Sequence, residues 1–388
     1  MTDPSAIRRI VVVGGGLAAA RTCTALRRKG YSGDLVLIGS EPHPPYDRPP
    51  LSKDVLAGTR DSTELPFDPQ ALSVRMRTTT TATGLDLATR TVTTTAGTEP
   101  FDRLVVATGA DPVRLPGDGE QCALRTVDDA VALRRRLVPG ARVVLVGASW
   151  IGAEVATAAL GAGCTVTCLE AGAAPLSAAL GTDVGALFTP WWRDVDLRLG
   201  TPVASVDRGG VRVADGTVLP ADVVVTGIGV RPSTGWLDGS GLVIDGGVHV
   251  DEHLRASAPG VVAVGDVAAR WSPRFGGRVR VEHWDEAGAA APVAAQVLLA
   301  DGTEDAETAG LPVHDPVPYF WSDQFGHKVQ YVGRHTATDQ AYVDDEAGKL
   351  RVRWYSSDGR LTAWLGVDRM RELVPARKEI AAALSPAA

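Results

Sequence analysis

The stretch RRIVVVGGGLAAARTCTALRRKGYSGDLVLIGSE, residues 8 to 41, decides the fold class. It reads as a strand, a glycine turn, a helix and a second strand that ends at Glu41, with Gly14, Gly16 and Ala19 at the small positions of the turn. This order is the βαβ fingerprint of a dinucleotide-binding domain. Glycine lets a pyrophosphate approach the backbone, and the helix N-terminus supplies free N–H groups. The terminal acid accepts hydrogen bonds from a ribose.

A second copy of the pattern lies at ARVVLVGASWIGAEVATAALGAGCTVTCLE, residues 141 to 170. Its small positions are Gly147, Ser149 and Gly152, and its terminal acid is Glu170. One match would be weak evidence, but two matches with strand, helix and acid in the same order predict that the chain binds two dinucleotides.

Three further apolar segments, residues 101–110, 222–232 and 260–268, read as buried strands of a central sheet. Ligands of open α/β folds lie at the carboxyl ends of such strands. Asp266 comes just after one of these ends, where it is either a ligand contact or part of a simple turn.

Length, charge and composition limit the functions that the chain can have. The 388 residues suffice for two or three domains, and a net charge of −7 argues against non-specific binding to nucleic acid or an anionic membrane. No long uncharged apolar run or signal-peptide pattern is visible, so we expect a cytoplasmic protein. The four cysteines form neither a disulfide framework nor a metal-binding pattern.

The stretch HPPYDRPPLSK, residues 43 to 53, contains four prolines. Each proline fixes φ and removes a backbone donor, so the segment is expected to be a stiff loop rather than a regular helix or a central strand. It holds Asp47, Arg48 and Lys53, and on these residues alone a binding loop and a plain linker are equally good interpretations.

These residues resemble a known family. The strings VVVGGGLAAA, YDRPPLSK, VVATGADP, GASWIGAEVA, VVVTGIGVRP, VVAVGDVA and PYFWSDQFGHKVQYVG are similar to those of FAD-dependent, NADH-linked ferredoxin reductases. The resemblance covers nearly the whole chain. It implies an α/β protein of glutathione-reductase-like architecture, with two Rossmann-like domains for FAD and NAD and a C-terminal α+β interface domain. The implied domains are residues 1–111 and 237–312 for FAD, 112–236 for NAD, and 313–388 at the C-terminus.

The resemblance also assigns roles to residues. Arg48 would lie near the flavin pyrophosphate, and Lys53 beside the reactive N5 edge, where it would pair with Glu154; Lys53 and Glu154 are the implied catalytic residues. The FAD contacts implied are Gly14, Gly16, Leu17, Ala18, Glu41, Arg48, Lys53, Ala82, Ala107, Thr108, Gly109, Asp266, Trp284 and Trp321. The NAD contacts implied are Gly147, Ser149, Trp150, Ile151, Gly152, Glu154, Glu170 and Gly229.

Some of these positions have plainer explanations. Glu154, expected on the first turn of its helix, could simply complement the helix dipole, and Trp284 and Trp321 could be ordinary core aromatics. Two features depart from the family pattern. Ser149 replaces the middle glycine of the second fingerprint, and the segment FTPWWRDVDL, residues 188–197, places Pro190 and two tryptophans where a helix should be ending.

The function implied is transfer of a hydride from NADH to FAD and of single electrons to an iron–sulfur ferredoxin, which would serve a cytochrome P450 or a ring-hydroxylating oxygenase. NADH is expected rather than NADPH because Glu170 would repel a 2′-phosphate and no arginine follows it. Glu170→Ala, combined with an arginine introduced at Ala171 or Ala174, is predicted to shift the preference towards NADPH. A thiol-based flavoenzyme is disfavoured because residues 40 to 53 contain no cysteine, and a redox-sensing flavoprotein is the second alternative.

An acidic ferredoxin would need a basic patch on this acidic chain. The stretch RWSPRFGGRVR, residues 270 to 280, carries Arg270, Arg274, Arg278 and Arg280 without one acid, and we predict that it forms a surface loop for docking. The cluster at 134–136 reads instead as a solvated helix face. A monomer or weak homodimer is expected.

Overall fold

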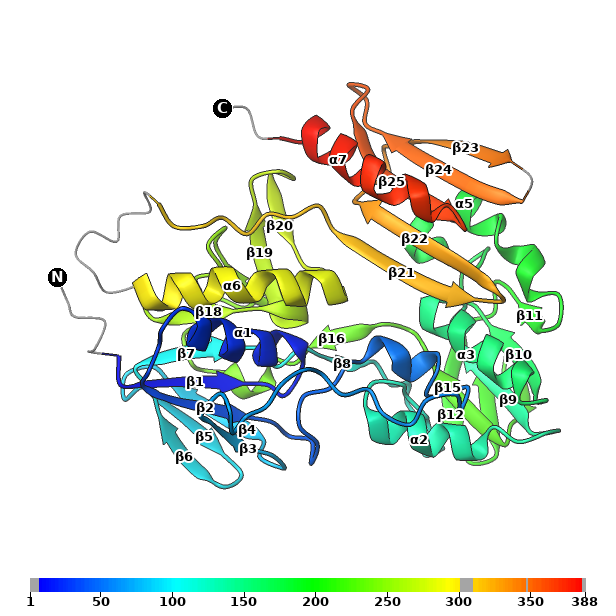
Figure 1. Cartoon of the computed structure of the whole chain (residues 1–388). Helices are drawn as coiled ribbons and strands as arrows, with labels where there is room; N and C mark the ends of the chain where they lie inside the picture. The colour runs from blue at the N-terminus through cyan, green and yellow to red at the C-terminus, as the bar shows by residue number, and fades with distance from the viewer. Residues whose placement is uncertain (1–6, 301–309, 347, 386–388) are drawn as a thin grey trace.

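The computed structural model describes residues 7–300, 310–346 and 348–385. Figure 1 shows two α/β bodies side by side, with a third body, built on an antiparallel sheet, above the second. The chain starts in the first body, passes to the second, returns to the first and ends in the third.

The first body is built on a five-stranded parallel sheet in the order β18-β7-β1-β2-β3. Helices α1 (Leu17–Arg28) and α6 (Trp284–Ala300) lie side by side over it (Figure 1). The strands are β1 (Arg9–Val13), β2 (Asp34–Ile38), β3 (Val74–Arg77), β7 (Arg103–Val106) and β18 (Val261–Ala263). A small antiparallel sheet adds β4 (Ala82–Asp86), β5 (Thr91–Thr94) and β6 (Gly97–Pro100).

The second body repeats the plan with a four-stranded parallel sheet in the order β11-β10-β9-β15. Its strands are β9 (Arg142–Val146), β10 (Thr165–Leu169), β11 (Asp196–Arg198) and β15 (Val223–Thr226), and its helices are α2 (Val127–Arg136), α3 (Trp150–Gly161), α4 (Ser177–Leu180) and α5 (Thr182–Ala186). A small antiparallel sheet is formed by β12 (Val203–Asp207), β13 (Gly210–Val213) and β14 (Val218–Pro220).

Two short pieces of chain connect the bodies. The ribbon of β8 (Ala110–Pro112) and β16 (Val230–Pro232) forms where the chain leaves the first body and where it returns. After the return come β17 (Val248–Val250), β19 (Ala268–Ser272) and β20 (Gly277–Val279), which form a three-stranded sheet.

The third body is a five-stranded antiparallel sheet in the order β21-β22-β25-β24-β23, against which α7 (Leu373–Ala383) packs. Its strands are β21 (Tyr319–Gln324), β22 (His327–Gly333), β23 (Gln340–Glu346), β24 (Lys349–Tyr355) and β25 (Leu361–Val367).

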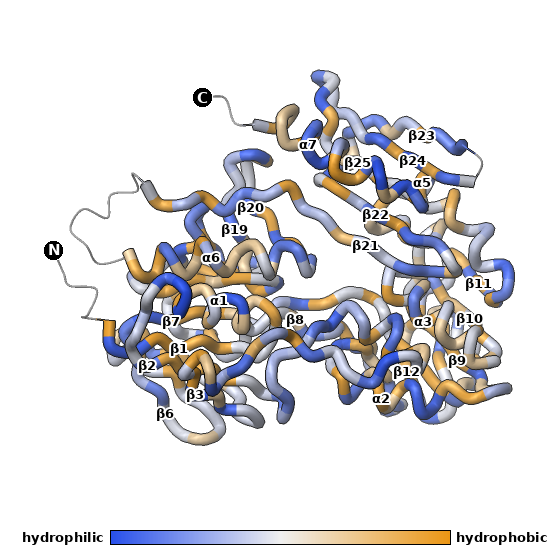
Figure 2. Tube along the Cα trace, viewed as in Figure 1, coloured by the Kyte–Doolittle hydropathy of each residue, from blue (hydrophilic) through white to orange (hydrophobic). Residues whose placement is uncertain are grey.

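The two parallel sheets form because their strands are apolar without interruption. In β1 and β2 all residues from the second onward are buried, and Figure 2 shows β1, β2 and β9 as hydrophobic stretches inside their bodies. A parallel sheet needs such strands because it is covered on both faces. The fold is therefore the predicted pair of Rossmann-like domains with a third α+β domain, in a glutathione-reductase-like arrangement.

The three further apolar segments are strands, as predicted, but they do not share one sheet. Residues 101–110 and 260–268 supply β7 and β18 of the first sheet, whereas residues 222–232 supply β15 of the second. The proline-rich stretch is mostly loop, as expected, and has one 3-10 turn at Pro49–Ser52.

The segment around Pro190 is not the end of a helix. Helix α5 ends at Ala186, and Thr189–Trp192 forms a separate 3-10 turn with Pro190 in its first positions. Trp191 stacks on His327 at 4.5 Å and Trp192 packs edge-on against Phe325 at 5.0 Å. The departure from the family pattern therefore has a packing role, because it attaches the second body to the β21–β22 hairpin.

Candidate functional site

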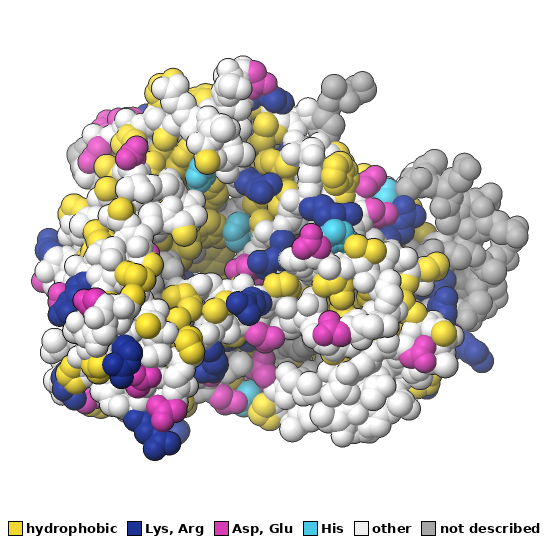
Figure 3. All heavy atoms as spheres, turned by 180° about the vertical axis from the view of Figure 1, so that it is seen from behind, with side chains coloured by type: hydrophobic (Ala, Val, Ile, Leu, Met, Phe, Trp, Pro, Cys, Tyr) yellow, Lys and Arg dark blue, Asp and Glu magenta, His cyan; other side chains and the backbone are white. Residues whose placement is uncertain are grey.

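A cavity of about 1240 Å³ lies where the three bodies meet. Its walls include the first glycine turn, the proline-rich stretch, the start of α3 and strand β21. Figure 3 shows the face opposite to that of Figure 1, hollowed near its centre, with histidine, acidic and basic side chains around the hollow. The volume is larger than that of most small-ligand pockets, which measure roughly 300–1,000 Å³, and suits a large cofactor.

All the residues predicted to contact FAD line this cavity, from Gly14 to Trp321. Of the residues predicted to contact NAD, only Trp150, Ile151 and Glu154 do so. The remaining ones, Gly147, Ser149, Gly152, Glu170 and Gly229, lie outside it.

The first glycine turn fits the diphosphate of a dinucleotide. A Cβ atom on Gly14 would lie 2.1 Å from the carbonyl oxygen of Ala107, so the fold itself requires glycine there. A Cβ atom on Gly16 would meet nothing within 4 Å, so protein packing does not explain that glycine. Gly16 is also the N-cap of α1 and offers no side-chain cap. The N-terminus of this helix therefore faces the cavity with its donors available to an anion.

The acid of the first fingerprint is held by side chains. Glu41 Oε1 accepts a hydrogen bond from Arg48 Nη2 at 2.6 Å, and Glu41 Oε2 accepts one from the Tyr46 hydroxyl at 2.5 Å. Burial, first of all, raises the pKa of Tyr46, so the phenol remains a donor. Arg48, expected near the pyrophosphate, thus contacts the acid of the first fingerprint and also lines the cavity.

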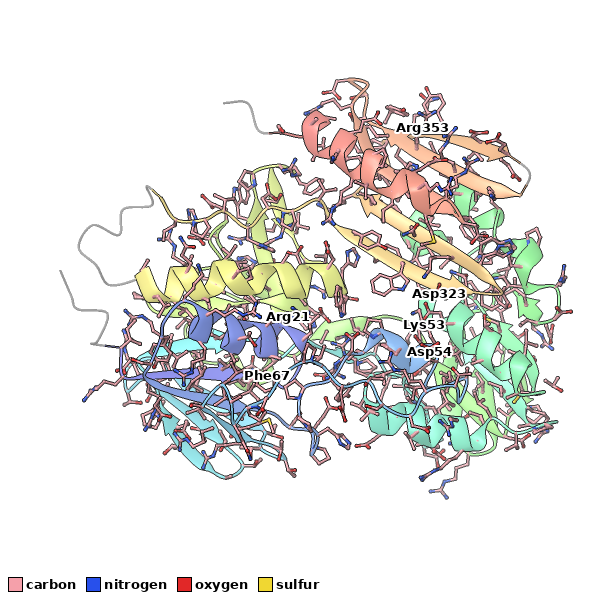
Figure 4. All side chains as sticks on the ribbon, viewed as in Figure 1. Arg21, Lys53, Asp54, Phe67, Asp323 and Arg353 are labelled. Carbon is pink, nitrogen blue, oxygen red and sulfur yellow. The ribbon has the colours of Figure 1, made fainter. Side chains whose placement is uncertain are left out.

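Lys53 and Glu154 form the predicted pair, with Nζ and Oε2 2.9 Å apart. Glu154 is 4% exposed and lies in the second turn of α3, not the first as expected. Its Oε2 also accepts from the Ser52 hydroxyl, and its Oε1 accepts from the Ser322 hydroxyl at 2.6 Å and the Asp323 N–H at 3.2 Å. Figure 4 labels Lys53 and Asp323 on facing elements.

This carboxylate joins all three bodies, because Lys53 comes from the first, Glu154 from the second and Ser322 from β21 of the third. A helix-dipole role does not explain four partners from two other bodies. Sequence reasoning found the pair but missed the two serines. Their only signal was their place in the strings YDRPPLSK and PYFWSDQ.

Arg125 is a third residue that sequence reasoning missed. Its Nη2 lies 2.9 Å from Asp266 Oδ2, and it lines the cavity close to Gly109. Asp266 is therefore more than part of a turn. Nothing in the string ALRTVDDA indicated Arg125, since its position follows from the path of the chain between the first two bodies.

Three aromatic rings lie in a row, and two of them, Trp284 and Trp321, line the cavity. The Trp284 and Trp321 rings are 6.2 Å apart, and Tyr319 stacks against Trp321 at 6.0 Å. The Trp284 indole N–H donates to Asp47 Oδ1 at 2.5 Å, and Trp284 is 37% exposed. These tryptophans are thus not simple core residues, because they border the cavity and Trp284 reaches the surface.

The second glycine turn differs from the first. Ser149 is the N-cap of α3, and its Oγ accepts a hydrogen bond from the Gly152 N–H at 3.1 Å. The hydroxymethyl group thus serves the helix itself. Glu170 accepts from two backbone donors, Ala148 N–H and Gly172 N–H, both at 2.7 Å.

The prediction of a docking loop at residues 270–280 is wrong for its first arginine, Arg270. Arg270 is 2% exposed and pairs with Glu286 and Asp315, each at 2.8 Å. The stretch 270–280 is the hairpin of β19 and β20, and the alternation of a strand turns this side chain inward. Arg274 Nη1 donates to the Ala381 carbonyl at 2.8 Å, which leaves Arg278 as the exposed member of the set.

Arg280 lines the cavity and lies 2.6 Å from Glu282. It therefore belongs to the inner wall and not to an outer loop.

The described residues hold no thiol at the cavity wall and no cluster of His, Cys, Asp and Glu that could hold a metal ion. Cys23 is buried in α1, and burial raises its pKa to about 12. A thiolate mechanism finds no support here. Nor does any helix in 7–300, 310–346 or 348–385 have the length and apolar character to cross a membrane.

Comparison with known proteins agrees with this geometry. Residues 8–291 match the family model described as pyridine nucleotide-disulphide oxidoreductase, and residues 319–388 match the one described as reductase C-terminal. The chain is 36% identical, over 97% of its length and 95% of the relative's, to the anthranilate 1,2-dioxygenase system ferredoxin–NAD(+) reductase component of Burkholderia cepacia. It is 33% identical, over 86% of its length and 82% of the relative's, to putidaredoxin reductase of Pseudomonas putida.

Solved structures show the same likeness. The crystal structure of Fdr9 has a TM-score of 0.94 with 58% identity, covering 97% of this chain and 95% of that one. The covalent putidaredoxin reductase–putidaredoxin complex has a TM-score of 0.89 with 30% identity, covering 98% of this chain and 94% of that one.

Proposed function

The chain belongs to the pyridine nucleotide-disulphide oxidoreductase family, and from that premise we propose that it is an FAD-dependent NADH:ferredoxin oxidoreductase. The relatives named above are ferredoxin–NAD(+) reductases of oxygenase systems. The observation that carries the proposal is the Lys53–Glu154 pair, which sets a cation against the second fingerprint helix inside a large cavity without a thiol among the described residues of its wall.

FAD is the proposed resident cofactor. When bound, it would accept a hydride from NADH and give up electrons singly. The N-terminus of α1, with Gly14, Gly16, Leu17 and Ala18, would hold its diphosphate, and Glu41, aligned by Arg48 and Tyr46, its ribose. The wall residues Ala82, Ala107, Thr108, Gly109 and Asp266, with Arg125 paired to Asp266, complete the proposed binding set.

Lys53 is the proposed catalytic cation. Its Nζ is held by Glu154 Oε2 at 2.9 Å and by the Pro49 carbonyl at 3.3 Å, so the charge has a fixed position at the cavity wall. A fixed cation in a site from which water is excluded stabilises negative charge that develops beside it. Glu154, in turn, is oriented by Ser52 and Ser322, and its side chain helps to close the site between the three bodies.

NADH is the proposed hydride donor. The turn residues Gly147, Ser149, Trp150, Ile151 and Gly152, together with Gly229, would bind it, and Glu170 would accept hydrogen bonds from its ribose. The Glu170 carboxylate also disfavours a 2′-phosphate by charge repulsion.

Electrons would leave towards an iron–sulfur ferredoxin past Trp284 and Trp321, since these rings lie between the cavity and the surface. Of the arginines first assigned to docking, Arg278 remains in the proposal because it is exposed. Domain bounds of 1–111, 112–236, 237–312 and 313–388 are likewise proposed, supported by the two crossings at the β8–β16 ribbon. A cytoplasmic location stays a prediction.

The test is stopped-flow mixing of the FAD-loaded protein with NADH, followed by steady-state turnover with a ferredoxin and cytochrome c as final acceptor. We expect rapid bleaching of the flavin and ferredoxin-dependent reduction of the cytochrome. A flavin that NADH bleaches but that no ferredoxin reoxidises would overturn the proposal. A long-lived complex of that kind would favour a redox-sensing flavoprotein.

A further inference from the structure

A second, smaller cavity of about 440 Å³ lies between α4 of the second body and the turn at residues 333–337 of the third. It shares seven lining residues with the larger cavity: Trp150, Ala178, Ala179, Val281, His283, Phe320 and Arg334. Since these seven residues line both, the smaller cavity adjoins the larger one. None of the predicted site residues explains it except Trp150.

The smaller cavity carries one positive charge. Its lining includes no Asp, Glu or Lys among the described residues, and Arg334 is its single arginine. Burial lowers the pKa of His283 to about 4 and also lowers the pKa of His335, so both imidazoles are neutral near pH 7. A cavity with one cation and no anion favours an anionic ligand.

Arg334 has no counter-ion among the described residues. The arginines that line the larger cavity are Arg48, Arg125, Arg280 and Arg334, and the first three pair with Glu41, Asp266 and Glu282. The Arg334 side chain makes no hydrogen bond or ion pair with any residue in 7–300, 310–346 or 348–385, although its backbone N–H donates to the Thr362 carbonyl at 3.0 Å. The preceding residue, Gly333, has φ +89° and room only for hydrogen, because a Cβ atom would lie 2.2 Å from that same carbonyl oxygen. The turn is therefore fixed while the guanidinium group stays available.

The wall opposite Arg334, which the second body forms, lacks the positive charge that would balance the diphosphate of a dinucleotide. Between Arg142 and Arg193 the chain contains no Lys or Arg, and this stretch includes the helix and the second strand of the second fingerprint, as well as α4. It does contain Glu154 and Glu170. A diphosphate carries two negative charges, and the N-terminus of α3 supplies only a partial positive charge, part of which Ser149 already satisfies.

We propose that Arg334, from the C-terminal body, binds the diphosphate of the nicotinamide dinucleotide across the cleft, and that the smaller cavity is the passage by which this dinucleotide reaches the flavin cavity. The proposal rests on NADH as the hydride donor and names the cation that the second fingerprint lacks. A guanidinium group suits this role because its planar donors match phosphate oxygens. Arg334 would act as a positioning and affinity residue, since it lies on a different body from the Lys53–Glu154 pair.

The decisive measurement is binding of NAD⁺ and of ADP-ribose to the FAD-loaded protein by isothermal titration calorimetry, at low and high salt. Arg334→Gln should weaken both ligands by about tenfold at low salt because it removes a charge-assisted hydrogen bond to phosphate, and Arg334→Lys should weaken them by less because the charge remains. The salt dependence of binding should be flatter in Arg334→Gln than in the parent.

Arg353→Gln is the matched control. Arg353 lies on β24 of the same body, lines neither cavity and likewise has no side-chain partner among the described residues (Figure 4). This variant should bind both ligands as the parent does. Equal weakening in the two variants would mean a general effect of surface charge and would overturn the proposal.

Reduction by dihydronicotinamide riboside, which has no phosphate, separates the phosphate contact from the hydride site. Arg334→Gln should be bleached by this donor at the parental rate, and a loss as large as with NADH would overturn the proposal. Unchanged binding of ADP-ribose to Arg334→Gln would overturn it as well, even if the parent reduces ferredoxin with NADH. A parent that binds ADP-ribose through Arg334 but fails to reduce ferredoxin would leave this inference intact and remove only the proposed function.

Discussion

The two glycine turns of the molecule, residues 14–19 and 147–152, have the same order of strand, turn and helix. They differ in whether a side chain caps the N-terminus of the helix that follows. At the first turn Gly16 offers no side-chain cap, and the turn lines the large cavity. At the second turn Ser149 caps the helix itself, and the glycine positions lie outside the large cavity. The free N–H groups of the uncapped helix end are available to a bound ligand, in keeping with the proposed resident cofactor, whereas the capped end keeps fewer free donors for a ligand.

The acids that end the two fingerprints also differ in what holds their carboxylates. Glu41 is held by the side chains of Arg48 and Tyr46, so its carboxylate is oriented independently of the turn. Glu170 accepts from the N–H groups of Ala148 and Gly172, so its carboxylate is part of the turn's own structure. Equal motifs in the sequence thus have different local structures, in keeping with the proposed cofactor site in one body and the proposed substrate site in the other.

The largest effect is expected from placing the same substitution in both turns. Gly14→Ala puts a Cβ atom 2.1 Å from a backbone oxygen at φ +127°, so it should destabilise the fold by about 3 kcal/mol and abolish FAD binding. Gly147→Ala puts a Cβ atom 2.7 Å from the Gly227 oxygen at φ +101°, and it should weaken NADH binding while FAD remains bound. In both variants, flavin content measures FAD binding, thermal melting measures stability, and titration with NADH measures binding of the donor.

Gly140→Ala is the control for this pair, because Gly140 has φ +82° and a Cβ atom added there would meet nothing within 4 Å. It should show the cost of left-handed backbone strain alone. If Gly147→Ala loses FAD as completely as Gly14→Ala does, the distinction between a resident and an exchanging site is wrong.

Lys53→Ala removes the contact between the proline-rich stretch of the first body and α3, the helix that follows the second turn. It should retain FAD, slow flavin reduction by NADH about a hundredfold and lower the flavin potential, because a fixed cation is lost from the site. Stopped-flow kinetics and a reductive titration measure these effects. Glu154→Gln, which can still accept from Ser322, should slow reduction less; parental kinetics in Lys53→Ala would remove the lysine from the site.

Low pH should destabilise the protein at the large cavity through protonation of His283. Burial, first of all, lowers the pKa of His283 to about 4, while the nearby carboxylates of Glu286, Asp266 and Asp285 raise it. Because the folded-state pKa is below the ordinary value of 6.5, the unfolded chain takes up the proton first, and stability is lost as the pH falls from 6.5 towards 4.

His283→Gln, which does not titrate, should therefore lose about 2 kcal/mol less stability than the parent between pH 7 and pH 4.5. Urea unfolding at the two pH values measures the difference. Equal losses in the parent and in His283→Gln would show that other groups carry the acid sensitivity of the flavin side.

Variants that change the preference for NADH test whether the Glu170 carboxylate is a structural part of the second glycine turn. Introducing arginine at Ala174 would fail, contrary to the prediction from sequence, because Ala174 is fully buried, whereas Ala171 is exposed. Glu170→Gln with Ala171→Arg keeps an acceptor for the turn and should shift the ratio of kcat/KM values about tenfold towards NADPH. Glu170→Ala with Ala171→Arg should lose affinity for both donors; a clean switch in that variant would contradict the structural role of the carboxylate.

The smallest effects should come from exchanging the caps. Ser149→Gly costs only a few tenths of a kcal/mol in stability and frees the Gly152 N–H, so NADH affinity should rise about twofold. Gly16→Ser should lower FAD affinity, because a hydroxyl would compete for the donors of α1. Calorimetric titration measures both, and a loss of NADH affinity in Ser149→Gly would mean that the hydroxyl itself binds the ligand.

Local patterns, together with the resemblance to a known family, allowed much of the fold and site to be predicted. The two fingerprints, the stiff loop at 43–53 and the pairing of Lys53 with Glu154 are present as expected. Arg125, Ser52 and Ser322 could not be found from spacing, because their partners lie far away along the chain. The docking prediction failed for Arg270 because a run of arginines was taken for a loop, whereas in a hairpin alternate side chains point inward.

By itself the sequence determined the chemistry that each turn can perform, because glycine positions, helix starts and terminal acids act within some thirty residues of chain. Only the tertiary structure decided which turn encloses its ligand. It brought Lys53, Glu154 and Ser322 together from three bodies and left Arg334 unpaired, among the described residues, opposite a wall without basic side chains. The physical reason is that charge complementarity acts through space, so the partner of a charged group is set by how the bodies pack and not by distance along the chain.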